Sequence, residues 1–271
     1  RISIRVNPNI DAQTHPYIST GLHENKFGVD IESAKRMYIH AKNSPSLDPV
    51  GIHFHIGSQI TELQPFKDAA VVLANLLRNL KALQIDIKFF DVGGGVGIRY
   101  DDETTISLYD YAQGIFAALG GLDVTLVCEP GRYLVGNCGY FITKVLYEKN
   151  NGFKRFVIVD GAMNDLIRPS LYGAYHEIEA YGKGAQDVTP CDVVGPVCES
   201  GDFFAKGIAL PSMEHDDILV VKSAGAYGFT MSSNYNSRTR VAEVALEEGK
   251  DRLIRRRENF EDLIALERAY L

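Results

Sequence analysis

The sequence predicts an α/β protein in two parts, a parallel sheet with helices followed by an antiparallel β domain. In the first half, short apolar runs alternate with helical repeats of apolar residues, which is typical of a parallel sheet. From about Gly139 onward, β-rich runs follow one another between Gly, Pro and Asp residues, with few helical repeats. We therefore predict a first domain at residues 1–137 and a second, ending in a helix, at residues 138–271.

The individual elements follow from apolar periodicity. Four runs are predicted as buried strands: Ile2–Val6, Val50–Ile56, Ile87–Val92 and Val124–Cys128. Three helices are predicted between them: Ile31–Lys42, Phe66–Leu83 and Ser107–Leu119. The second helix repeats apolar residues at spacings of three and four, and Ser107 is a suitable N-cap for the third. The last segment, Asp251 to Tyr270, returns to helical spacing and predicts a C-terminal helix.

Composition and charge exclude several classes of protein. The chain has 271 residues, 45% hydrophobic and 23% charged, enough to bury a sizeable core. The net charge of -7, with a single basic run at Arg255–Arg257, argues against a nucleic-acid partner. No apolar stretch reaches the roughly 18 to 20 residues of a membrane span, and no leader opens the chain, so we expect a cytoplasmic protein. The opening "RISIRVNP" is a strand already in progress, which suggests a fragment.

Four cysteines are present, and none of them forms a CxxC pair. In a chain of this length they do not resemble a disulfide framework, and we interpret them as thiols.

The residues just after each parallel strand are the first candidates for a site, because these folds place their chemistry at the carboxyl ends of the strands. Gly93–Gly95 lack the spacing of a dinucleotide fingerprint. Bare backbone can instead turn its N–H groups toward a phosphate. The next strand end supplies Gly131 and Arg132. We therefore expect a phosphate site at these two ends, since a tight turn explains one glycine easily and three poorly.

His53 and His55 lie on the same face of a strand, a spacing that suits a metal ion. A barrel metallohydrolase is therefore an alternative interpretation. That chemistry needs further His or Asp ligands at later strand ends, and Gly and Glu follow there instead. A core histidine is the simpler explanation of His53, whereas His55, next to Gly57 and Ser58, is placed to lie over a flat ring.

Glu129 ends an apolar strand, where an uncompensated buried carboxylate is costly. We expect a cationic or hydrogen-bonded partner for it. A structural pair with Arg132 is one interpretation. In the other, Glu129 faces a protonated ring nitrogen while Arg132 binds phosphate or carboxylate.

Five separated motifs, in order, resemble those of the alanine-racemase-like pyridoxal-phosphate decarboxylases: "HIGSQI", "DVGGGVGI", "EPGR", "GPVCESGD" and "SAGAYG". The resemblance implies the C-terminal part of a (β/α)8 barrel followed by a β domain. Within that group the chain looks like the diaminopimelate decarboxylases. The motifs that indicate this are Ile18–Val29, Asn164–His176 and Gly225–Arg238.

Carried over position by position, the resemblance assigns the cofactor, pyridoxal 5'-phosphate, to the strand ends. It implies that the phosphate is held by Gly94, Gly95, Ser58, Arg132 and Tyr227. It also implies that His55 stacks on the pyridine ring and that Glu129 pairs with the ring nitrogen. A carboxylate there keeps the nitrogen protonated, so that the ring can accept the electron pair released as carbon dioxide leaves.

The resemblance also implies that Cys198 donates a proton to the carbanion and that Glu199 binds the distal ammonium of the substrate. A thiol with a reference pKa of about 8.5 keeps its proton near neutrality. A small core residue is the alternative for Cys198, although the Gly, Pro and acidic residues beside it argue against an apolar core. The distal carboxylate would be gripped by Arg132, Arg168 and Tyr172, with Tyr227 close by. Arg168 could equally be a surface arginine.

The resemblance implies decarboxylation of meso-2,6-diaminopimelate to L-lysine, by a homodimer that shares Cys198 and Glu199 between subunits. The family's cofactor-bonding lysine lies on an early barrel strand, and no lysine here matches that motif, because only about the last four of eight strands are present. We therefore assign the activity to the intact protein. Two alternatives stay open. One is a sister decarboxylase of ornithine, arginine or carboxynorspermidine, for which Arg168 and Glu199 are decisive. The other is a non-catalytic homologue.

Overall fold

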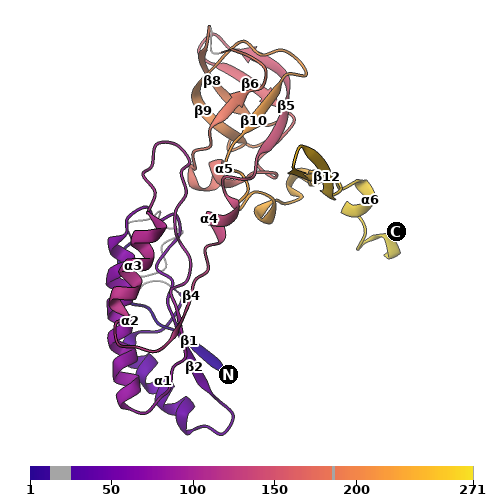
Figure 1. Cartoon of the computed structure of the whole chain (residues 1–271). Coiled ribbons are helices and arrows are strands. Elements are labelled where there is room, and N and C mark those ends of the chain that lie inside the picture. Colours follow the sequence, from indigo (N-terminus) through magenta and orange to yellow (C-terminus); the bar gives the residue numbers. More distant parts are fainter. Residues whose placement is uncertain (13–25, 185–186, 271) are drawn as a thin grey trace. The chain divides into compact units, whose positions relative to one another are not determined.

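The chain folds into two compact units, Arg1–Leu134 and Val135–Leu271. The structure is a computed structural model that describes residues 1–12, 26–184 and 187–270 (Figure 1). Residues 18–25 of the motif at Ile18–Val29 lie outside the described residues. Each unit has its own hydrophobic core, one centred on the first sheet and its helices and the other on the second sheet.

The first unit contains a parallel sheet with the strand order β1-β2-β3-β4. Its strands are β1 (Ile2–Arg5), β2 (Pro49–His53), β3 (Phe89–Asp91) and β4 (Thr125–Val127). The register aligns Arg5 with His53, and His53 with Asp91. The prediction of four parallel strands is confirmed, and the residues that follow the strands meet at one edge of the sheet.

Three longer helices accompany this sheet (Figure 1). They are α1 (Ile31–Asn43), α2 (Gln64–Ala82) and α3 (Leu108–Ala118), close to the predicted ranges. The Ser107 side chain caps α3 by accepting the Asp110 N–H, as expected, and Asp30 caps α1 through the Ser33 N–H at 2.8 Å. α2 buries its apolar stripe, including Leu73, against the sheet. Within the described residues, no helix is long and apolar enough to cross a membrane.

The second unit is built on a six-stranded sheet with the order β7-β10-β5-β6-β8-β9. Its strands are β5 (Phe141–Asn150), β6 (Arg155–Val159), β7 (Ile178–Ala180), β8 (Thr189–Val194), β9 (Phe203–Leu210) and β10 (Ile218–Val221). Neighbouring strands are antiparallel except for β6 and β8, which run parallel. The predicted antiparallel β domain is thus confirmed, with one parallel pairing that the sequence did not indicate. Two short helices carry candidate site residues: α4 (Gly131–Val135), at the end of the first unit, and α5 (Arg168–Tyr172), in the second.

The prediction of a helix from Asp251 to Tyr270 is wrong over its first part. This region forms a hairpin of β11 (Glu243–Glu247) and β12 (Lys250–Arg255), then α6 (Phe260–Leu263) and a 3-10 turn at Arg268–Tyr270. The hairpin turns at Glu248 and Gly249, which have φ of 50° and 77°. Two successive left-handed residues match the twist of a two-residue hairpin, and they override the apolar spacing that suggested a helix.

All four cysteines are free thiols. Cys191 is buried in the second sheet, whereas Cys128, Cys138 and Cys198 are exposed. Cys198 is therefore not a small core residue, and the simpler of its two interpretations is wrong.

Candidate active site

Charged and polar side chains gather at the carboxyl edge of the parallel sheet. The strand register places Arg5, His53 and Asp91 side by side, and Glu129 follows β4. His53 Nε2 lies 3.6 Å from Glu129 Oε2. Burial lowers the pKa of His53, while Asp91 and then Glu129 oppose that shift. Arg5, which the sequence analysis did not single out, donates through Nη2 to the carbonyl of His55 at 3.2 Å.

The glycines after β3 are required by close contacts between neighbouring loops. Gly93 and Gly95 have φ of 66° and 101°, a conformation that side chains disfavour. A Cβ on Gly94 would lie 2.1 Å from the carbonyl oxygen of Glu129, and one on Gly95 would lie 2.2 Å from that of Gly57. The loop therefore touches both neighbouring strand ends through its main chain. A merely tight turn does not explain this arrangement.

His55 is a neutral ring held at the glycine loop. Its Nδ1 accepts the N–H of Gly94 at 3.1 Å, so the proton of the neutral ring is on Nε2. Burial and the nearby Arg5 guanidinium lower the pKa of His55 to about 4. The ring is therefore uncharged at neutral pH. Because the Gly94 amide is engaged by His55, its main-chain contribution to a phosphate site would need that bond to change.

Arg132 is buried at the start of α4 and faces two hydroxyl groups. Its Nη2 donates to Ser58 Oγ at 3.1 Å, and its Nη1 donates to the hydroxyl of Tyr100. A buried guanidinium among hydroxyls is suited to an anion such as phosphate. The structure thus brings Ser58 and Arg132 together. Tyr100 is a member of this group that the sequence analysis missed, although only Arg99 separates it from the glycine motif.

Gln59 fixes the loop after β2 against the glycine loop. Its Nε2 donates to the carbonyl of Ile98 at 2.6 Å, and its Oε1 accepts the Ile98 N–H at 3.1 Å. Gln59 itself has a φ of 58°. This pair of bonds holds Ser58 in place, a role for the Gln of "HIGSQI" that spacing alone did not reveal.

The expectation that Glu129 is buried is wrong, because its side chain is 55% exposed. It does have a neighbouring partner, since His53 Nε2 lies 3.6 Å from its carboxylate. The carboxylate follows a short strand at the rim of the sheet, where it meets solvent. Glu129 is thus available to a ligand at this rim.

The metal interpretation paired His53 with His55, and the structure separates their roles. His55 Nδ1 is bonded to the Gly94 amide. His53 instead shares a cluster with Asp91 and Glu129, whose potential ligand atoms all lie within 4.8 Å of one another. Asp91 also caps the glycine loop by accepting the Gly93 N–H at 2.9 Å. One member of the cluster is therefore already committed to holding the loop.

The other candidate residues lie in the second unit. Cys198 and Glu199 are exposed in the turn before β9, and Arg168 and Tyr172 lie on α5. α5 is tied to that turn because Ser170 Oγ donates to the carbonyl of Gly201. Arg168 is 6% exposed, so its interpretation as a surface arginine is wrong. Tyr227 is 43% exposed and has a φ of 59°.

Asp202 anchors the turn that carries Cys198. Its carboxylate accepts the N–H groups of Met163 at 2.7 Å and Val197 at 2.8 Å. Burial raises the pKa of Asp202, and these backbone bonds oppose the shift. The sequence analysis quoted Asp202 within "GPVCESGD" without giving it a role.

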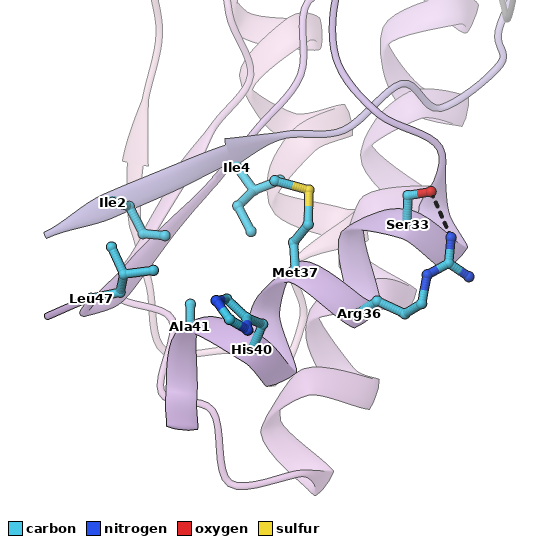
Figure 2. A pocket seen from close by; sticks show the side chains of 8 residues that line it. All are labelled: Ile2, Ile4, Ser33, Arg36, Met37, His40, Ala41 and Leu47. Carbon is cyan, nitrogen blue, oxygen red and sulfur yellow. Dashed lines mark hydrogen bonds between the residues drawn. The ribbon is translucent and has the colours of Figure 1, made fainter. Parts of the chain in front are cut away.

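A separate pocket of about 440 Å³ lies between β1 and α1. Figure 2 shows Ile2, Met37 and Leu47 around it, with Arg36 bonded to the Ser33 hydroxyl at 2.9 Å. Its lining is mainly apolar, and among the described residues it contains no carboxylate and no predicted site residue. The strand-end cluster, and not this pocket, is the candidate active site.

Comparison with known proteins shows which sequences this chain resembles. Residues 1–136 match a family model described as "Pyridoxal-dependent decarboxylase, pyridoxal binding domain". A diaminopimelate decarboxylase of Campylobacter jejuni is 65% identical over 100% of this chain and 67% of its own length. One from Helicobacter pylori is 57% identical over 98% of this chain and 66% of its own length.

Solved structures of diaminopimelate decarboxylases have a fold similar to that of this chain. Diaminopimelate decarboxylase from Helicobacter pylori complexed with L-lysine has a TM-score of 0.97 and 56% identity, covering 100% of this chain and 68% of that one. The enzyme from M. jannaschii, also in complex with L-lysine, has a TM-score of 0.89 at 37% identity, covering 97% of this chain and 62% of that one. The chain thus spans about two thirds of the length of the curated relatives it matches.

Proposed function

The chain belongs to the pyridoxal-dependent decarboxylases, in the family of the diaminopimelate decarboxylases, and from this we propose that the whole protein converts meso-2,6-diaminopimelate to L-lysine and carbon dioxide. The observation that carries the proposal is the His55–Gly94–Glu129 arrangement, found in a chain that is 65% identical throughout to a curated enzyme of that activity. A biosynthetic reaction on a free amino acid also supports a cytoplasmic location, which we include in the proposal.

The residues at the strand ends fit the cofactor, pyridoxal phosphate. The buried Arg132 guanidinium beside Ser58 would bind the phosphate, with Gly95, Gly131 and Tyr227 as further contacts. A Cβ on Gly94 or Gly95 would lie within 2.1 to 2.2 Å of a neighbouring carbonyl oxygen, so the loop has no room for side chains that would block this anion. When bound, the cofactor supplies an electron sink for the pair left at the reacting carbon.

Two side chains of the first unit would orient the cofactor ring. The neutral His55 ring would pack against its face, because its low pKa keeps a positive charge away from the stack. Glu129, exposed at the rim, would hold a proton at the ring nitrogen. Holding that proton is the role that favours decarboxylation, since a protonated ring withdraws electrons more strongly.

Residues of the second unit would bind the substrate and return a proton to it. The Cys198 thiol, exposed in a turn held by Asp202, would protonate the carbon that loses carbon dioxide. Glu199 would bind the distal ammonium, and Arg168 with Tyr172 the distal carboxylate. Arg132 and Tyr227 would complete this carboxylate site.

The proposal includes a homodimer in which Cys198 and Glu199 of one subunit serve the other subunit's cofactor. Mixing full-length chains that carry Cys198→Ala with chains that carry Glu129→Ala tests this. Each variant alone is expected to be inactive. A random mixture should recover about a quarter of normal activity, because half of the dimers then have one intact site of two. Absence of any recovery would exclude shared sites.

The activity is tested by incubating the full-length protein and pyridoxal phosphate with meso-diaminopimelate, and separately with ornithine, arginine and carboxynorspermidine. We expect lysine and carbon dioxide from the first and no turnover of the others, because they lack the distal carboxylate that Arg168 would bind. Turnover of ornithine without turnover of diaminopimelate would support the sister decarboxylase instead. Cofactor binding without turnover of any substrate would identify a non-catalytic homologue.

A further inference from the structure

Arg168 and His176 form a buried pair in the second unit. Arg168 is 6% exposed and His176 is 2% exposed. Arg168 Nη1 lies 2.8 Å from His176 Nε2. The two residues meet because α5 ends at Gly173, whose φ of 61° reverses the chain, with its N–H bonded to the Arg168 carbonyl. The sequence analysis placed His176 at the end of a motif and gave it no role.

The partners of His176 determine where its proton lies. A guanidinium only donates hydrogen bonds, so Nε2 must accept the bond from Arg168. The second ring nitrogen, Nδ1, lies 2.8 Å from the carbonyl oxygen of Lys222, which only accepts. Nδ1 therefore carries the proton. The ring is neutral, has a single tautomer, and cannot turn over without losing both bonds.

A neutral hydrogen-bond acceptor affects the Arg168 guanidinium differently from a charged one. It fixes the direction of the guanidinium without cancelling the positive charge. A carboxylate in the place of His176 would form an ion pair and compete with an incoming anion. The bond to His176 uses one of the five N–H donors of the guanidinium.

We propose that His176 is a positioning residue for substrate recognition: it holds the Arg168 guanidinium in the orientation that grips the distal carboxylate. This inference rests on the proposed function. α5 is also bonded to the turn of Cys198 and Glu199 through Ser170 and the Gly201 carbonyl, so the oriented arginine and the turn belong to one hydrogen-bonded assembly.

The test compares two ligands of the holoprotein that differ only in the carboxylate. L-lysine, the product of the proposed reaction, keeps the distal carboxylate, and cadaverine has the same carbon chain without it. For His176→Ala we expect about a ten-fold weaker Kd for lysine, as for loss of a bond to a charged group. Cadaverine affinity should stay within about two-fold. Titration calorimetry measures both, and equal weakening for the two ligands would overturn the proposal.

A matched variant distinguishes loss of the proposed role from loss of the fold. The amide of His176→Gln keeps one acceptor for Arg168 and one donor for the Lys222 carbonyl, and it should recover most of the lysine affinity. A His176→Gln protein that is folded by its melting curve, yet binds lysine no better than His176→Ala, would contradict the proposal.

A double-mutant cycle isolates the route through the arginine. If His176 acts through Arg168, adding His176→Ala to Arg168→Met should weaken lysine binding no further. Full additivity would overturn the inference. Failure of the proposed function looks different, because the unaltered holoprotein would then neither decarboxylate diaminopimelate nor bind lysine. If it does bind lysine, and His176→Ala binds equally well, only the role of His176 is lost.

Discussion

The first unit holds its glycine loop through main-chain packing, whereas the second unit holds its candidate residues through buried side chains. At the parallel sheet, Gly93–Gly95 contact neighbouring carbonyls directly, and His55 is bonded to a backbone amide. In the β domain, Asp202 and His176 are buried acceptors that fix the turn of Cys198 and the guanidinium of Arg168. A main-chain site leaves a mark in the sequence as glycines, and a side-chain site does not. The difference can be tested residue by residue.

The largest effect is expected at Asp202. In Asp202→Ala the N–H groups of Met163 and Val197 lose their acceptor inside the protein, which should lower the free energy of unfolding by about 4 kcal/mol. Asp202→Asn keeps one acceptor oxygen and should lose about half as much. Urea unfolding of both variants measures this. Equal stability of Asp202→Ala and the unaltered protein would show that side chains do not hold this unit.

Gly94→Ala should produce the next largest effect. The new Cβ would lie 2.1 Å from the Glu129 carbonyl, so one loop must move, at a cost of about 3 kcal/mol. We expect the affinity for pyridoxal phosphate to fall about a hundred-fold, measured by equilibrium dialysis. The control is Gly120→Ala, where the nearest atom would be 3.5 Å away. If both variants bind the cofactor alike, the main-chain packing is not decisive.

The low pKa of His55 predicts that the stability of the first unit depends on pH. Its pKa is about 4 in the folded protein, against about 6.5 unfolded. Between these values the unfolded ring binds a proton that the folded ring does not, so the free energy of unfolding falls as the pH falls from 6.5 to 4. The loss is about 2 kcal/mol after allowing for solvent at the part-exposed ring. Subtracting the unfolding curve of His55→Gln from that of the unaltered protein isolates this contribution. A difference that does not change with pH would contradict it.

Lys222→Met should have the smallest effect. The ammonium contacts Glu177 and Glu179 at 2.9 Å, but both carboxylates are more than half exposed. Such pairs contribute about 0.5 kcal/mol. The backbone carbonyl that accepts from His176 is unchanged, so thermal unfolding should shift little. A loss near that of Asp202→Ala would show that exposed charges also hold this unit.

Periodicity explains how far the sequence could predict the fold. Alternating strands and helices were recognised because each buries one face, as α2 does through Leu73 and its neighbours. The β11–β12 hairpin was missed because its turn uses Glu248 and Gly249, a weaker signal than Asn-Gly, and because its strands are exposed.

The residues of the candidate site, like the elements of the fold, could be predicted only in part. Ser58 and Arg132 were correctly brought together because both follow parallel strands. The exposure of Glu129 was predicted wrongly, since an apolar strand does not reveal whether the next side chain points into the protein or out of it. Asp202 and His176 could not be recognised as anchors, because a buried acceptor and a solvated polar residue look alike in a single sequence.

The contact between Gly94 and the Glu129 carbonyl also has a consequence for how this protein can change over generations. Every other amino acid adds at least one carbon at position 94, and the carbonyl there belongs to the residue proposed to face the cofactor nitrogen. A mutation in one loop therefore disturbs the acid in the other. We expect an accepted substitution in one loop to require a matching substitution in the other. A library that randomises one loop and keeps the other constant should therefore yield few folded and active variants.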